Sequence, residues 1–217
     1  MFGPQSGVLR RRCVYLWLDF LSTVVVSFAF VSFSFHFMHN FIVFMWVPSL
    51  LAVSSEVGGV LPTGLVFSSF MLSMTLGGML FSLLLPVFPG GAEGLCVLVY
   101  FVAALAMAVP LWRFEFWYVV VAFLVLEAMV GMFNSCGATL RSRYYPEGLQ
   151  SSIMSVFRLP LNLIVVIGTR LTNNANSVPA LQFVFGAVVC MHLVAMVLQV
   201  ALWAKVSSCA AHKQKQQ

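Results

Sequence analysis

The chain is organised around residues 127–162, which read EAMVGMFNSCGATLRSRYYPEGLQSSIMSVFRLPLN. It starts with Glu127 inside an apolar run, passes several small residues, makes a basic turn at 140–147 and enters a second apolar run. An ionisable side chain at membrane depth is costly unless it is paired, protonated or hydrated. Glu127 is therefore a candidate functional residue. The alternative is a protonated carboxyl group that is hydrogen-bonded within a helix bundle.

The composition of the whole chain is that of a membrane protein. Charged residues make up 8% of the 217 residues and Phe alone contributes 21, whereas soluble domains carry about 25% charged residues. The mean hydropathy is +1.01. Because lipid tolerates no unpaired backbone groups, the long apolar runs must be helical. The sequence predicts an all-α, polytopic membrane helix bundle of about six transmembrane helices, with no room for a water-soluble domain.

The predicted order is a basic cytoplasmic lead-in at 1–21, a transmembrane bundle at 22–204 and a polar cytoplasmic tail at 205–217. A turn at 86–91 holds two prolines and two glycines, which end one helix before the next begins. Small residues along the second span permit close approach of a neighbouring helix. The six predicted spans are about 22–51, 62–85, 93–111, 115–139, 150–171 and 179–204.

Polar residues mark two of these spans. His36, His39 and Asn40 share one face of the first span at helical spacing. Two histidines one turn apart could bind a metal ion, but no carboxylate or thiol stands beside them. We interpret this face as the polar wall of a pore, with a structural hydrogen-bonded histidine as the alternative. In the fifth span Pro160 frees a backbone carbonyl that could meet a substrate at membrane depth.

The basic residues predict the orientation. With six spans both termini share a side, and nine of the eleven Lys and Arg residues fall on it. The positive-inside rule therefore predicts that both termini are cytoplasmic. Because these residues are scattered at helix ends rather than gathered on a soluble face, we expect no nucleic-acid partner despite a pI near 9.2.

The sequence gives no sign of an enzyme. It contains no nucleophile–base pair, metal cluster or phosphate-binding loop, so we expect no catalytic residues, metal or cofactor. Its five cysteines lie in or beside apolar runs without a metal-binding or CxxC spacing. We expect no disulfide.

Four strings resemble one family: FMWVP at 44–48, GLVFSSFM at 64–71, LRSR at 140–143 followed by Pro146 and Glu147, and FRLPLN at 157–162. They are similar to the molybdate-anion transporter branch of the major facilitator superfamily. The strings follow the family's order and fall in what would be its last six spans. The resemblance covers about residues 15 to 205, as half of a major facilitator fold.

The resemblance implies molybdate uptake across the plasma membrane by alternating access, with the substrate site between two six-helix halves. Glu127, Arg158 and Asn162 fall where the family tends to carry polar residues. Two departures are that His36 stands where the family usually has Glu, and that the first six helices are absent. The family also implies a cytoplasmic gate at Arg141 and Arg143, paired with Glu147 or a neighbouring helix; the alternative is plain positive-inside anchoring.

Three hypotheses follow. The first is the C-terminal half of a transporter for molybdate or a similar oxyanion. An ionised Glu127 would repel such a dianion, so it would bind a proton or balance a cation such as Arg158, while Arg, Asn and His side chains hold the anion. The second is a truncated or incomplete membrane protein that does not transport. The third is a half-transporter that works only as a homodimer or with a partner half.

The predicted topology can be tested with epitope tags in intact cells. Tags at Met1 and Gln217 should be protected from external protease, whereas a tag in the polar loop at 172–177 should be cleaved. Cleavage of the C-terminal tag would contradict six spans.

Overall fold

In a computed structural model, described for residues 35–36, 39–40, 43–54, 61–144, 155, 163 and 178–214, the chain is helical, and no strand occurs in these residues. A short apolar helix, Val43–Val53, precedes the longer ones. The longer helices are α2 (Thr63–Leu84), α3 (Gly91–Trp112), α4 (Phe116–Tyr144) and α6 (Val178–Gln214).

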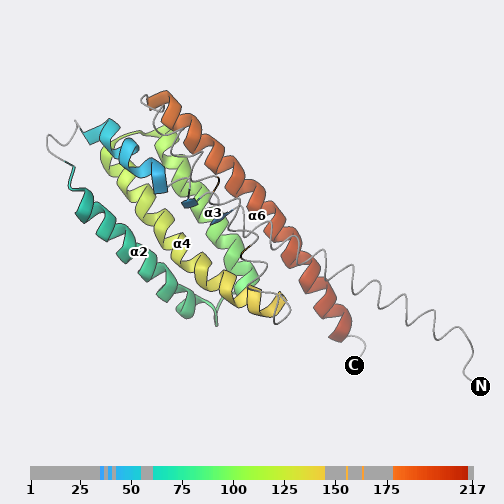
Figure 1. Cartoon of the computed structure of the whole chain (residues 1–217). Helices are drawn as coiled ribbons and strands as arrows, with labels where there is room; N and C mark the ends of the chain where they lie inside the picture. The colour runs from blue at the N-terminus through green and yellow to red at the C-terminus, as the bar shows by residue number, and fades with distance from the viewer. Residues whose placement is uncertain are drawn as a thin grey trace, which may run out of the picture.

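Helices α3 and α4 form the centre of the bundle. They pack against each other, α2 packs against α4, and α6 packs against α3. The four helices therefore lie side by side in the order α2, α4, α3, α6 (Figure 1). The short connections from α2 to α3 and from α3 to α4 make these consecutive helices antiparallel, as expected of successive membrane crossings.

Four helices of the described part are long and apolar enough to cross a membrane: α2, α3, α4 and the α6 residues Val178–Ser208. The all-helical membrane bundle predicted from composition is thus confirmed, but the described residues support four spans rather than six. The predicted spans at 22–51 and 150–171 lie partly or largely outside these residues. Two helices also continue past the apolar runs, α4 through its basic end to Tyr144 and α6 through the polar residues to Gln214.

Glycine permits the turn between α2 and α3. Gly90 and Gly91 both have positive φ, 87° and 58°, a conformation that side chains with a Cβ rarely adopt. Gly90 also lies against the indole ring of Trp203 in α6, and a Cβ at this position would overlap that ring. The turn predicted at 86–91 therefore also makes room for α6.

The small residues of α2 let its backbone touch that of α4. A Cβ on Gly77 would overlap the carbonyl of Ala128, and a Cβ on Gly131 would overlap the carbonyl of Met74. The Ser73 hydroxyl donates a hydrogen bond to the Leu124 carbonyl across the same contact, at 2.6 Å. The close approach predicted for the second span is confirmed, and α4 is the helix it meets.

Aromatic rings fill the core on the other side of α4. Phe35 stacks on Phe133 with 3.9 Å between ring centroids, and Tyr100 of α3 meets both rings edge-on. Large apolar side chains point outward on α2 and α6, including Leu65, Leu83 and Phe183, each at least 69% exposed. These outer faces match a lipid environment rather than water.

Gly77→Ala and Gly64→Ala place the same methyl group at two positions of α2. Gly77→Ala should lower stability by about 1–3 kcal/mol because the methyl group overpacks the contact with α4. Gly64 has open space around it, so Gly64→Ala should be neutral or slightly stabilising. Thermal unfolding of purified protein in detergent measures both. Equal melting temperatures for the two variants would contradict the backbone contact.

Candidate functional site

Glu127 is the buried carboxylate of α4. Its side chain is 6% exposed, and it lies eleven residues after Phe116, roughly 16 Å along a helix that rises 1.5 Å per residue. The position is therefore well inside a span. It also belongs to the turn of α4 that contacts α2, next to Ala128.

His39 faces Glu127 from a segment far away in sequence. Its Nδ1 atom lies 3.9 Å from Oε1 of the Glu127 carboxylate, beyond the usual hydrogen-bond range of about 2.7–3.2 Å. Within the described part of the chain, His39 Nδ1 and Glu127 Oε2 are buried without a hydrogen-bond partner. Buried polar atoms are normally satisfied. The pair is a site that a proton or a polar atom of a ligand could complete.

The neighbours of His39 hold this segment against α4. The ring of His36 lies 5.8 Å from that of Phe133, and Asn40 donates its side-chain N–H to the His36 carbonyl at 2.8 Å. Asn40 thus bonds to its own segment. Of the three polar residues predicted to share a face, His39 has its ring nitrogen 3.9 Å from the Glu127 carboxylate.

Three further candidates, Arg158, Asn162 and Glu147, lie outside the described residues, so their roles and the predicted pairing of Glu127 with Arg158 stay predictions. Among the residues with a described structure, no group of three or more His, Cys, Asp or Glu side chains could hold a metal ion. The His39–Glu127 pair offers two potential ligands, too few for the usual protein zinc site.

A second polar cluster lies where α3 begins and α4 ends. The buried carboxylate of Glu93 accepts hydrogen bonds from Arg143 Nη1 and the Tyr144 hydroxyl, each at 2.6 Å. Gln199 of α6 donates its amide to the Glu93 backbone carbonyl at 3.3 Å. These four residues, the Glu93 cluster, link α3, α4 and α6 through one acidic residue.

Glu93 was not singled out by the sequence analysis, although a signal was available. It is one of six acidic residues, and it occupies the first turn of α3, where a negative charge is favoured by the helix dipole. Arg143 thus pairs with a residue of the neighbouring helix α3, while the gating role predicted for the basic turn stays a prediction. Arg141 lies back along α4, with its guanidinium near Gly137.

The arrangement defines the protein as a multi-pass membrane protein, an all-helical bundle with a buried acidic residue at membrane depth and a charge pair at one end. The chain is 30% identical over 136 residues to a protein called molybdate-anion transporter from Takifugu rubripes. This match covers 58% of the chain but only 26% of the length of the fish protein. No family model and no solved structure matches the chain.

Glu93→Ala should destabilise the bundle more than Glu115→Ala. Glu93 is buried and bonded to Arg143 and Tyr144, so its removal should cost about 1–3 kcal/mol. Glu115 makes an exposed 3.5 Å pair with Arg113, and its loss should cost less than about 1 kcal/mol. Thermal unfolding in detergent compares the two variants. If both variants had the melting temperature of the wild type, the Glu93 cluster would have no stabilising role.

Proposed function

We propose that this chain is part of a membrane transporter of the major facilitator superfamily, with Glu127 and His39 as its proton-binding or charge-balancing pair. The substrate class we propose is molybdate or a related tetrahedral oxyanion, taken up across the plasma membrane with both termini cytoplasmic. The observation that carries the proposal is the buried, incompletely hydrogen-bonded contact between His39 and Glu127.

The chemistry of this pair supports coupling better than direct anion binding. Two buried groups that face each other without a hydrogen bond can share a proton, and the gain or loss of that proton changes the charge of the site. An ionised Glu127 in contact with an oxyanion would repel it. Protonation of Glu127 removes that repulsion, and protonation of His39 offsets it with a positive charge. Either event links anion occupancy to proton occupancy at one place.

The anion itself needs hydrogen-bond donors. A tetrahedral dianion is best held by Arg, Asn and His side chains or by helix N-termini. We propose that Arg158 and Asn162 supply such donors, and that His36 and Asn40 continue the polar wall. The similarity to the Takifugu rubripes protein supports the substrate class.

We further propose that the Glu93 cluster, together with Arg141 in the same last turn of α4, forms part of the cytoplasmic gate. An Arg–carboxylate pair between the ends of two helices can open and close as the helices move apart. Arg143 is half exposed and Glu93 is buried, so breaking the pair returns the arginine to water, and Glu93 must gain water or a proton as the gate opens. Positive-inside anchoring is the simpler alternative for Arg141 and Arg143.

Uptake of radiolabelled molybdate into cells tests the proposal. The chain is expressed alone and together with a six-helix first half, because the active form could be a homodimer or an assembly with a partner half. In the active assembly, Glu127→Gln keeps the shape of the side chain but cannot ionise. It should lower uptake and flatten its dependence on external pH.

Glu115→Gln is the matched control, since Glu115 is an exposed residue at the α3–α4 turn. It should leave uptake and its pH dependence unchanged. If Glu127→Gln showed wild-type uptake with an unchanged pH dependence, the coupling role of Glu127 would be contradicted and a structural role would remain. No uptake above empty cells in any assembly would favour a membrane protein that does not transport.

A further inference from the structure

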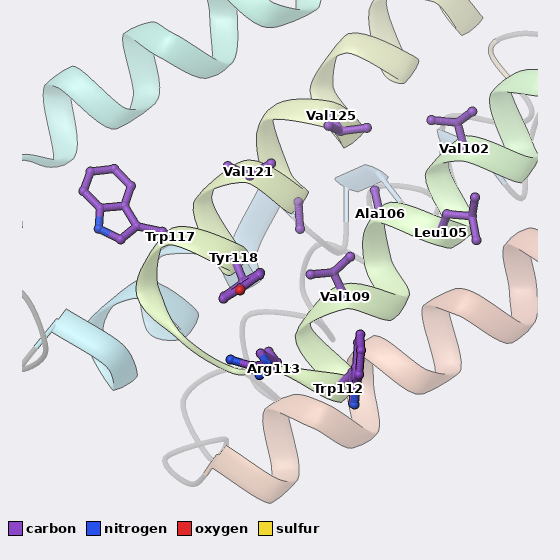
Figure 2. Close-up of a pocket in the computed structure, with 11 residues that line it drawn as sticks. Val102, Leu105, Ala106, Val109, Trp112, Arg113, Trp117, Tyr118, Val121 and Val125 are labelled. Carbon is purple, nitrogen blue, oxygen red and sulfur yellow. The ribbon is translucent and has the colours of Figure 1, made fainter.

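A groove of about 660 Å³ opens between α3 and α4 on the outside of the bundle (Figure 2). Its walls carry apolar side chains from both helices, and among the described residues that line it Arg113 is the one with a charge. It does not include Glu127, His39 or any member of the Glu93 cluster. The apolar residues used below are Val102, Leu105, Val109, Val121 and Val125.

Polar and aromatic groups gather at one end of this groove. Figure 2 shows Arg113, Trp112, Trp117 and Tyr118 around the α3–α4 turn, with the valines further along both helices. Trp and Tyr are enriched at the level of lipid headgroups. The groove thus starts at the membrane surface and continues into the hydrocarbon region.

The length of the groove corresponds to one leaflet. Val102 and Trp112, both in the lining on α3, are ten residues apart, about 15 Å of helix at 1.5 Å per residue. The hydrocarbon core of a bilayer is about 30 Å thick. An acyl chain that enters at the turn would therefore reach about the middle of the membrane within the groove.

We propose that this groove binds one phospholipid, with an acyl chain along the valines and the phosphate on Arg113. Arg binds phosphate through two parallel hydrogen bonds. The guanidinium of Arg113 lies 5.8 Å from the centre of the Tyr118 ring, and this contact holds the charge at the mouth. The site does not depend on the transport function proposed above.

Glu115 competes for the same cation. Its carboxylate lies 3.5 Å from Arg113 Nη1, and both side chains are about half exposed. An exposed pair of this kind contributes little stability, so a phosphate can displace the carboxylate. Glu115→Gln should therefore strengthen lipid binding, whereas Arg113→Gln should weaken it about tenfold, as expected for the loss of charge-assisted hydrogen bonds.

A helix of a partner protein is the other occupant to consider. A helix with its side chains is about 10–12 Å wide and would leave Arg113 with the exposed Glu115 carboxylate as its anion unless the helix supplied a carboxylate of its own at that level. The positive charge at the mouth and the one-leaflet length favour the phospholipid.

The test uses the full chain, purified in detergent, stripped of lipid and incubated with phosphatidylglycerol or with diacylglycerol of the same acyl chains. Native mass spectrometry counts bound molecules as lipid concentration rises. We expect one saturable phosphatidylglycerol per chain and at least about tenfold weaker binding of diacylglycerol, which lacks the phosphate. Excess inorganic phosphate should not displace the lipid, because the acyl chain contributes much of the binding.

Two variants with the same added ring test the groove. Val109→Phe narrows it and should abolish the saturable binding. Val197→Phe adds the ring on the exposed face of α6 and should leave it unchanged. Circular dichroism confirms that each variant is folded, and Arg113→Gln gives an independent measurement at an exposed position.

Three results would overturn the proposal. The first is equal binding of phosphatidylglycerol and diacylglycerol. The second is wild-type affinity in folded Arg113→Gln and Val109→Phe. The third is a dimer of the chain that excludes phosphatidylglycerol and is lost in Val109→Phe, which would identify a second copy as the occupant.

Discussion

The contact between the backbones of α2 and α4 is the constraint on which the buried site depends. At Gly77 and Gly131 a helix backbone lies against the carbonyl of its neighbour. The residues of α4 involved, Leu124, Ala128 and Gly131, recur at helical spacing and form one stripe. Glu127 stands three residues after the first of them and four before the last. The glycines therefore fix α4 at the level where its one buried carboxylate lies.

Close approach also explains how a polar residue is tolerated at this depth. In lipid, helices associate through packing and interhelical hydrogen bonds rather than through a hydrophobic driving force. The α2–α4 contact combines close packing at the glycines with an interhelical hydrogen bond, which the Ser73 hydroxyl donates to the Leu124 carbonyl. On another side of α4, Phe35 packs on Phe133 and brings the segment of His39 next to Glu127. Glu127 is thus enclosed by protein rather than by lipid.

The sequence was sufficient for the class of fold, an all-helical membrane bundle, because apolar runs of this length can only be membrane helices. It underestimated α4, whose apolar run ends at Leu140. The helix continues because Arg143 and Tyr144 bond to Glu93 in α3, and a contact fifty residues away leaves no local pattern. The same reason explains why Glu93 was missed.

The candidate site was predictable by residue type but not by pairing. Glu127 and His39 each stand out as polar residues in apolar runs, yet charge alone suggested Arg158 as the partner of Glu127. The contact with His39 depends on how two distant helical segments pack, which is decided by the fit of Phe35 on Phe133. Ring packing of this kind is common to any aromatic core, so the sequence could not distinguish it.

Helix α4 connects the two polar sites through its own rigidity. Glu127 and Arg143 are sixteen residues apart on one continuous helix, about 24 Å at 1.5 Å per residue. A change of charge at Glu127 that shifts α4 against α2 would also shift the end of α4 against Glu93. The contacts of Glu127 and Arg143 respond together only if α4 has two discrete positions and each contact favours one of them over the other. In the Glu93–Arg143 pair the arginine is half exposed and the carboxylate is buried, so such a shift can separate the two groups only as water or a proton reaches Glu93.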